Sequence, residues 1–233
     1  MKSFFITGTD TDVGKTFIAC GLMQAFNEKT LKTIGYKPIS AGCERVNGEL
    51  ENGDAKKLLA ASSVSLSLSE VNPIAFEPPI APHIAAAQVN SVIRPQEIVT
   101  GWHHLAEKSP DVLITEGAGG WALPINQSLT LPDVLKQLPQ QVILVVGLRL
   151  GCLNHALLTA DAIKHAGFEL AGWVANHLSD AMPVVEENIA TLKSMIDAPL
   201  LGEVPWVEVS DESTLASEQA TQYLNIESLL KNN

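Results

Sequence analysis

The residues best suited to chemistry lie in a glycine-rich stretch near the amino terminus, GTDTDVGKT, which runs from Gly8 to Thr16. Glycines let several backbone amide hydrogens converge on phosphate oxygens, and a helix that begins directly afterwards adds its partial positive charge. In loops of this kind the lysine, here Lys15, reaches the β and γ phosphates, while the Thr16 hydroxyl binds Mg²⁺. The spacing between Gly8 and Gly14 is one residue longer than in the usual pattern, so we interpret the stretch as a variant phosphate-binding loop.

Two acidic residues fit the role of magnesium ligands. Glu116 ends the apolar run Val112 to Thr115 and precedes the glycine-rich segment Gly117 to Gly120. Mg²⁺ keeps several waters and takes one or two protein carboxylates besides substrate phosphates, so Glu116 and one further acid suffice. Asp54, at the start of a predicted helix, is the natural second ligand, although a helix cap is the more ordinary reason for an aspartate there.

A lysine is predicted to reach the same region. The segment Gly35-Tyr36-Lys37-Pro38 puts Lys37 at the end of an apolar run, which the proline prevents from continuing as a central strand. If Lys37 lies near Lys15, two ammonium groups and Mg²⁺ would surround a transferred phosphoryl group and stabilise its charge. The alternative is a solvated lysine at a strand end.

Other features carry weaker signals. The stretch Leu148 to Asn154 precedes a predicted helix, and its amides could hold a carboxylate or form a bare helix start. The six histidines lack metal-ligand spacing, so we predict no zinc site. The tryptophans are expected to be packing residues, except that Trp206 follows a predicted strand end and could border a purine.

Alternating strands and helices must position these side chains. Apolar runs predict strands, and amphipathic spacing predicts helices. The predicted strands are residues 2–7, 33–36, 112–115, 142–147, 170–175 and 200–204, and the predicted helices begin at residue 15 or span 54–61, 95–107, 154–166 and 184–195. Such alternation indicates an α/β fold with a mostly parallel sheet flanked by helices, which binds ligands at the carboxyl ends of its strands. Residues 62–93 are assigned little structure.

Composition and charge restrict the class of protein. The 233 residues, 46% hydrophobic and 18% charged, suit a single domain spanning residues 1–233 with a substantial core. The net charge of -11 disfavours nucleic acid and membrane lipid as partners. The chain shows neither a signal-peptide core nor an apolar run long enough for a membrane span, so a cytoplasmic location is expected. Its 3 cysteines lie far apart, which fits neither a disulfide framework nor a metal site.

A series of motifs resembles the dethiobiotin synthase family in order and over nearly the whole chain: GTDTDVGKT, GYKP, NGDA, EGAGGW, VVGLRLGCLNHALLTA, GWVAN and LGEVPW. The resemblance implies a three-layer P-loop NTPase fold and a homodimer whose active site spans the subunit interface. It also implies an ATP- and Mg²⁺-dependent ring closure in biotin synthesis, with diaminopelargonic acid and carbon dioxide as substrates. One amine is carboxylated, the carbamate oxygen attacks the γ-phosphate, and the second amine displaces phosphate to give dethiobiotin.

Matched position by position, the resemblance also implies residue roles. Thr16, Asp54 and Glu116 match the magnesium ligands, and the catalytic positions are Lys37, Lys15 and Thr11. The substrate-binding positions are Thr11, Lys37, Ser40 and, in a loop that would reach the substrate carboxylate of the other subunit, Gly151, Cys152, Leu153 and Asn154. The nucleotide-binding positions are Asp12, Val13, Gly14, Lys15, Thr16, Phe17, Asp54, Glu116, Gly117, Ala118, Gly119, Asn176, His177, Pro205, Trp206, Val207 and Glu212.

Two departures from the family pattern and two rival classes bear on this interpretation. The hydroxyl near the loop glycine lies one position early, at Ser40, and His177 stands where an acid is common. Partition and septum-positioning ATPases share a deviant phosphate loop, but they carry an extra lysine early in it, where this chain has Thr9, Asp10 and Thr11. Ligases of cobalamin synthesis usually carry a glutaminase domain, for which 233 residues leave no room.

Overall fold

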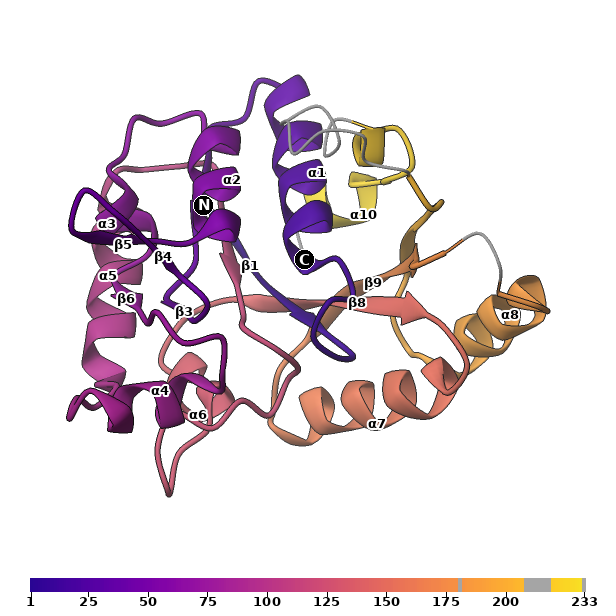
Figure 1. Ribbon diagram of the computed structural model, residues 1–233. Coiled ribbons are helices and arrows are strands. Elements are labelled where there is room, and N and C mark those ends of the chain that lie inside the picture. Colours follow the sequence, from indigo (N-terminus) through magenta and orange to yellow (C-terminus); the bar gives the residue numbers. More distant parts are fainter. Residues whose placement is uncertain (180–181, 208–218, 232–233) are drawn as a thin grey trace.

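A six-stranded parallel sheet forms the centre of the protein in the computed structural model, which describes residues 1–179, 182–207 and 219–231. Its strands are β1 (Lys2–Gly8), β2 (Thr33–Tyr36), β7 (Val112–Glu116), β8 (Gln141–Leu148), β9 (Leu170–His177) and β10 (Leu200–Val204). They lie in the order β10-β9-β8-β1-β7-β2, and each neighbouring pair is parallel. Their carboxyl ends therefore meet at one edge of the sheet (Figure 1).

Runs of consecutive apolar residues form the central strands because both faces of the sheet are covered. Every residue of β8 after Gln141 is buried, and so is every residue of β7. Along β1, Phe4 and Ile6 pack into the core beneath α1 (Lys15–Glu28). Phe5 points to the other face, into the core shared with α5 (Pro95–Glu107) and α7 (Cys152–His165).

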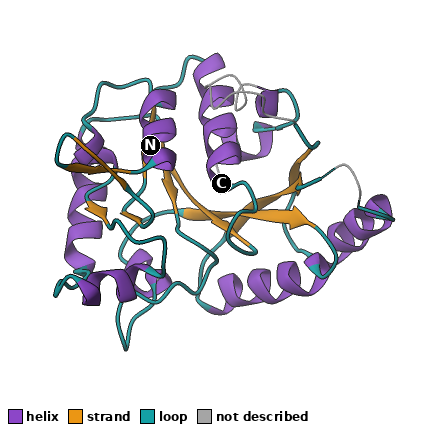
Figure 2. Ribbon diagram, viewed as in Figure 1, coloured by secondary structure: helices purple, strands orange, loops and turns teal. Residues whose placement is uncertain are grey.

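Helices on the two faces complete a three-layer α/β arrangement (Figure 2). One face carries α1, α2 (Gly53–Ala61) and α10 (Glu227–Leu230), which share one core cluster. The other face carries α5, α6 (Leu131–Leu135), α7 and α8 (Val185–Met195), which share the second. None of the helices in the described ranges has the length and hydropathy needed to cross a lipid bilayer.

The elements predicted from periodicity are all present, with ends that differ by at most two residues. The predicted helix 95–107 coincides with α5. The helix predicted to begin at Asn154 begins instead at Cys152, because Gly151, with φ 92°, ends the preceding loop as the N-cap. Cys152, Leu153 and Asn154 therefore belong to the first turn of α7 rather than to a loop.

Residues 62–93 contain more structure than predicted. They form α3 (Leu68–Val71), β6 (Ile74–Ala75) and α4 (Pro82–Gln88), and β6 pairs in parallel with β3 (Ile39–Ser40). Another small sheet pairs β4 (Glu44–Val46) antiparallel with β5 (Glu49–Glu51). The expectation of little structure is wrong because these elements are too short to show a helix or strand period, and tertiary packing determines them.

Candidate active site

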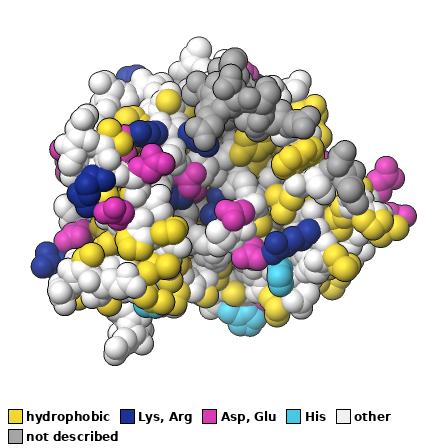
Figure 3. All heavy atoms as spheres, viewed as in Figure 1, with side chains coloured by type: hydrophobic (Ala, Val, Ile, Leu, Met, Phe, Trp, Pro, Cys, Tyr) yellow, Lys and Arg dark blue, Asp and Glu magenta, His cyan; other side chains and the backbone are white. Residues whose placement is uncertain are grey.

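A cleft of about 980 Å³ opens at the carboxyl ends of β1, β2 and β7, beside the start of α1. Figure 3 shows charged side chains of both signs gathered at this hollow. The cleft brings together half of the residues predicted from the sequence, although they come from separate parts of the chain. The predicted residues that line it are Thr11, Asp12, Gly14, Lys15, Thr16, Phe17, Lys37, Ser40, Asp54, Glu116, Ala118 and Gly119.

The phosphate loop is shaped by contacts with neighbouring strands. Gly14, the N-cap of α1, has φ 87°, which is the left-handed conformation that favours glycine. The Asn176 side chain at the end of β9 donates from Nδ2 to the Val13 carbonyl at 2.9 Å. The Thr9 amide donates to the Val145 carbonyl of β8 at 3.0 Å. These contacts fix the loop in a conformation that exposes amides to an anion.

Lys15 lies folded over its own loop and is 7% exposed. Its Nζ donates to the Asp10 carbonyl at 3.0 Å. Burial lowers the pKa of Lys15, the Glu116 carboxylate opposes that effect, and the neighbouring Lys37 ammonium adds to it. The electrostatic influence of Lys37 on Lys15 supports the prediction that the two ammonium groups share one site.

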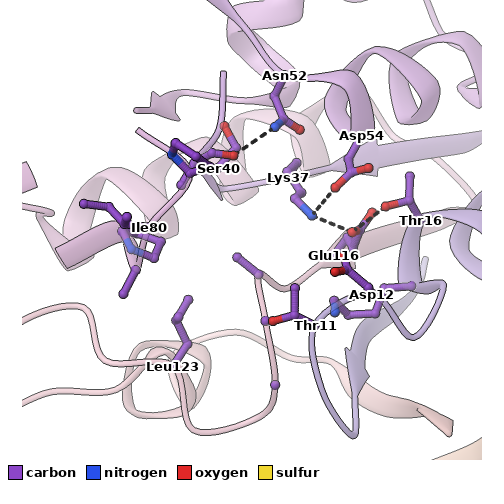
Figure 4. A pocket seen from close by; sticks show the side chains of 18 of the residues that line it. Thr11, Asp12, Thr16, Lys37, Ser40, Asn52, Asp54, Ile80, Glu116 and Leu123 are labelled. Carbon is purple, nitrogen blue, oxygen red and sulfur yellow. Dashed lines mark hydrogen bonds and ion pairs between the residues drawn. The ribbon is translucent and has the colours of Figure 1, made fainter. Parts of the chain in front are cut away.

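Lys37, Glu116, Asp54 and Thr16 form one connected cluster (Figure 4). Lys37 Nζ donates to Glu116 Oε1 at 2.5 Å, to the Gly117 carbonyl at 3.1 Å and to Asp54 Oδ2 at 3.3 Å. Thr16 Oγ1 donates to the same Glu116 oxygen at 2.9 Å. An ammonium group has three protons to donate, so these contacts use the whole donor capacity of Lys37.

Burial and charge act in opposite directions on this cluster. Burial alone would lower the pKa of Lys37, but the Glu116 and Asp54 carboxylates outweigh it and raise that pKa. Burial likewise opposes ionisation of Asp54, but the Lys37 ammonium prevails and lowers the Asp54 pKa. Burial raises the pKa of Glu116, with Lys37 opposing the rise. When both acids are ionised, the Lys37 and Lys15 ammonium groups, which line the same cleft, balance their two negative charges.

Asn52 holds Asp54 at the edge of the cleft. Asn52 is the N-cap of α2, and its side-chain oxygen accepts a hydrogen bond from the Ala55 amide at 3.1 Å. Its amide nitrogen donates to the Ala41 carbonyl at 3.4 Å. Asp54 is therefore not the cap of this helix, and its side chain, 44% exposed, is available to the cleft.

The cluster fits a magnesium ion. Glu116 Oε2 is buried and has no hydrogen-bond partner among the described residues. A buried carboxylate oxygen with nothing to accept costs free energy, which a bound cation would recover. Together with Asp54 and the Thr16 hydroxyl, Glu116 offers the oxygen ligands that Mg²⁺ prefers.

Three polar residues at or behind the cleft were missed by the sequence analysis. Asn52 precedes a predicted helix, which is a capping signal, and Lys57 lies one helical turn after Asp54 on the same side of α2. Asn72 lies in the segment that was assigned little structure. Ser40 lines the cleft as predicted, but its hydroxyl donates to Asn72 Oδ1 at 2.7 Å, so it is already engaged.

The wall opposite the phosphate loop is apolar, which the sequence analysis also missed. It has no charged side chain and suits an aliphatic group. Its residues are Ala41, Pro79, Ile80, Ala81, Pro82, Ala122, Leu123 and Pro124.

The remaining predicted residues lie outside this cleft. Val13 is a buried residue of the phosphate loop, and Asn176, which donates to its carbonyl, is buried as well. The Gly117 carbonyl accepts a hydrogen bond from Lys37. His177 contacts Glu203 at 2.9 Å. Three residues follow the end of β10 as an exposed or half-buried segment, namely Pro205, Trp206 and Val207. Glu212 lies outside the described residues.

The start of α7 also lies apart from the cleft wall. Gly151, Cys152, Leu153 and Asn154 form its N-cap and first turn, where no side-chain cap is present. Leu150 just before them is 99% exposed. The adjacent Arg149 forms an ion pair with Asp10, which links this helix start to the phosphate loop. Residues 151–154 therefore do not line the cleft of their own chain.

Comparison with known proteins identifies close sequence relatives. A family model described as an AAA domain matches residues 2–214. The ATP-dependent dethiobiotin synthetase BioD of Alteromonas mediterranea is 49% identical over 227 residues, which cover 93% of this chain and 97% of that protein. Proteins of the same name from Cellvibrio japonicus and Pseudomonas aeruginosa are 46% and 43% identical. They cover 98% and 97% of this chain and 98% and 99% of their own lengths.

Solved structures share the fold at much lower identity. A ParA family ATPase from Chlorobium tepidum TLS superposes with a TM-score of 0.58 at 15% identity, covering 99% of each chain. The septum site-determining protein MinD complexed with Mg-ADP, from Pyrococcus horikoshii OT3, gives 0.56 at 15% identity over 95% of this chain and 94% of that one. The chain thus has the three-layer α/β P-loop fold. The similarity to the partition and septum-positioning class concerns the fold alone.

Proposed function

The chain belongs to the ATP-dependent dethiobiotin synthetase family, and we propose that it closes the ureido ring of dethiobiotin from diaminopelargonic acid, carbon dioxide and ATP. The observation that carries this proposal is the meeting of two lysines and two carboxylates at the phosphate loop. Lys15, Lys37, Asp54 and Glu116 all line one cleft. Such a site suits a reaction in which an anionic group is phosphorylated.

The proposed chemistry begins with carbon dioxide uptake by one amine of the substrate, which gives a carbamate. A carbamate oxygen then attacks the γ-phosphorus of ATP, and ADP leaves. The second amine finally attacks the carbonyl carbon of the mixed anhydride, closes the ring and expels phosphate. Charge develops on the carbamate and phosphoryl oxygens, and fixed cations that are already aligned stabilise that charge at little reorganisation cost.

Lys15 and Lys37 would supply these fixed cations from opposite sides of the transferred group. Lys15 has one backbone contact, to Asp10, that it can exchange for a phosphate oxygen. Lys37 has no spare proton and must also exchange a contact. Its bond to Asp54 is the longest of the three, at 3.3 Å, and Asp54 is the more exposed carboxylate, so we expect that contact to be exchanged.

Mg²⁺ would be held by Thr16, Asp54 and Glu116. The unpartnered Oε2 of Glu116 supports this assignment. When bound, the ion would draw negative charge from the phosphate oxygens. The loop residues 12–17 would bind the phosphates through their backbone amides, and residues 117–119 would lie beside them.

We propose that the nucleoside lies against residues 176–177 and 205–207, with Glu212 as a further contact. The hydrogen bond from Asn176 to the phosphate loop supports its proximity to a bound nucleotide. The substrate diamine would lie near Thr11 and Lys37, and its aliphatic chain would lie along the apolar wall of the cleft. A direct contact between Ser40 and the substrate stays a prediction. The hydrogen bond that the Ser40 hydroxyl donates to Asn72 disfavours it.

We further propose a cytoplasmic homodimer in which the start of α7 completes the site of the other subunit. Exposed Leu150 and the absence of a side-chain cap at the start of α7 support this proposal. Uncapped amides at a helix start attract a carboxylate, and the substrate has a carboxylate at the end of its chain. Dimerisation is testable by sedimentation, and Leu150→Asp should weaken it.

The decisive test supplies purified protein with ATP, Mg²⁺, isotopically labelled bicarbonate and diaminopelargonic acid. We expect a product that contains the labelled carbon, and its mass should equal that of diaminopelargonic acid plus carbon dioxide minus one water. ADP and phosphate should form with it. A reaction without diaminopelargonic acid is the control for uncoupled ATP hydrolysis. Nucleotide hydrolysis without label in a ureido product would contradict the proposal.

A further inference from the structure

We propose that Asn72 is a positioning residue that fixes Lys37 at the cleft, an inference that rests on the proposed function of this lysine. Asn72 is 7% exposed and does not line the cleft itself. It caps the carboxyl end of α3, where its own backbone amide donates to the Leu68 carbonyl at 2.8 Å. Its side chain is therefore presented from the end of a short helix whose last turn closes on Asn72 itself.

The Asn72 side chain joins the two halves of the segment around Lys37. Nδ2 donates to the Lys37 carbonyl at 2.7 Å and approaches the Ile74 carbonyl at 3.4 Å. Oδ1 accepts a hydrogen bond from Ser40 Oγ at 2.7 Å. The buried Asn72 amide thus bonds Lys37 before Pro38 and Ser40 after it, and connects both to the segment 72–74.

The segment around Lys37 needs such support because β2 ends at Tyr36. Pro38 has no amide hydrogen, so it cannot extend the hydrogen-bonded ladder. The Lys37 amide donates to the Val71 carbonyl at 2.8 Å, and the Lys37 carbonyl accepts from Asn72. Both main-chain polar groups of Lys37 are therefore held by two consecutive residues of the same turn.

Displacement of the backbone would be transmitted to the Lys37 ammonium. The side chain is 5% exposed and has its three contacts in fixed directions, so it has little room to compensate for a shift of its Cα atom. A misplacement of about 1 Å in a catalytic group can reduce turnover on the order of 100-fold. Asn72 would therefore act on turnover through Lys37 while leaving the phosphate loop untouched.

The experiment compares Asn72→Ala with Asn27→Ala, a matched control in α1 whose side chain contacts Thr33 at the start of β2. Asn27 Nδ2 donates to the Ala61 carbonyl at 3.0 Å, and its Oδ1 accepts from Thr33 Oγ1 at 2.8 Å. The control thus loses one bond to a carbonyl and one from a hydroxyl, and Asn72→Ala loses the same two kinds of bond together with the longer contact to the Ile74 carbonyl. It removes them where β2 begins, far along the strand from Lys37.

We expect Asn72→Ala to lower kcat for ring closure by roughly 10- to 100-fold with the KM for ATP changed by less than about threefold. Asn27→Ala should leave kcat within about twofold of wild type, even where its urea midpoint falls as far as that of Asn72→Ala. Equal kcat values in the two variants would overturn the inference. So would a loss of nucleotide affinity in Asn72→Ala as large as its loss of kcat.

A second pair of variants covers the case in which Asn72→Ala fails to fold. Asn72→Asp keeps the side-chain volume and the acceptor for Ser40 but loses the donor to Lys37, and Asn27→Asp is its control. The same kcat criterion applies to this pair. If wild-type protein forms no ureido product, the proposed function fails; if it does and Asn72 variants turn over normally, only the role of Asn72 is overturned.

Discussion

Replacement of Gly14 by alanine tests whether contact with Asn176 shapes the phosphate loop. A Cβ atom at Gly14 would lie 2.3 Å from Asn176 Nδ2, and the residue has φ 87°. Gly167, which follows α7, also has φ 87°, but a Cβ atom there would meet nothing within 4 Å. Gly167→Ala therefore measures the conformational cost alone, and the difference between the two variants measures the collision.

The expected magnitudes follow from these two contributions. A left-handed conformation costs an alanine about 1–2 kcal/mol, and the stiffer unfolded chain returns about 0.4–1 kcal/mol of that. Gly167→Ala should thus lower the free energy of unfolding by about 1 kcal/mol. At Gly14 the Asn176 amide must also leave the Val13 carbonyl, and loss of this buried hydrogen bond adds about 1–3 kcal/mol. The total for Gly14→Ala is about 3 kcal/mol.

Urea denaturation of the two single variants measures the difference, and a double-mutant cycle assigns it. In an Asn176→Ala background the collision is absent, so Gly14→Ala should cost only about as much as Gly167→Ala, roughly 1 kcal/mol. Calorimetry should also show weaker ATP binding by Gly14→Ala, because the loop amides shift, and unchanged binding by Gly167→Ala. Equal destabilisation by both alanines, or a cost at Gly14 that persists without Asn176, would refute the reasoning.

Three further predictions concern single charged side chains. Lys37→Gln should lower kcat by at least about 100-fold while calorimetry still detects nucleotide binding, because Lys37 acts on developing charge; undiminished turnover would exclude that role. Lys57→Ala should raise the KM for ATP a few-fold at low salt, since its exposed ammonium lines the cleft. Lys56→Ala, which removes an ion pair outside the cleft, is the control, and an equal rise in both would assign the effect to net charge. The Lys108 ammonium and the Ser67 amide hold the pKa of Glu70 below its usual range. Its contribution to stability is therefore present at neutral pH and lost as the pH falls through that lowered pKa, so urea midpoints of Glu70→Gln should vary less with acidification than those of wild type.

The sequence predicted the parts of the site that depend on neighbouring residues. The loop from Gly8 to Thr16 combines a strand end, glycines, a lysine and a helix start within a few residues. A short motif of this kind is enough to predict phosphate binding. Helix α5 was predicted at both ends because its apolar residues recur over several turns. The short elements between residues 62 and 93 were missed because so few residues give no measurable period.

Only the tertiary structure decided which side chains meet. Lys37 and Glu116 are 79 residues apart, Asn72 and Lys37 are 35 apart, and Asn176 and Val13 are 163 apart. The strand order β10-β9-β8-β1-β7-β2 puts β7 between β1 and β2, and that order alone brings Glu116 between the phosphate loop and Lys37. Local periodicity carries no information about strand order or about a single hydrogen bond between distant segments, because both are selected by packing of the whole core.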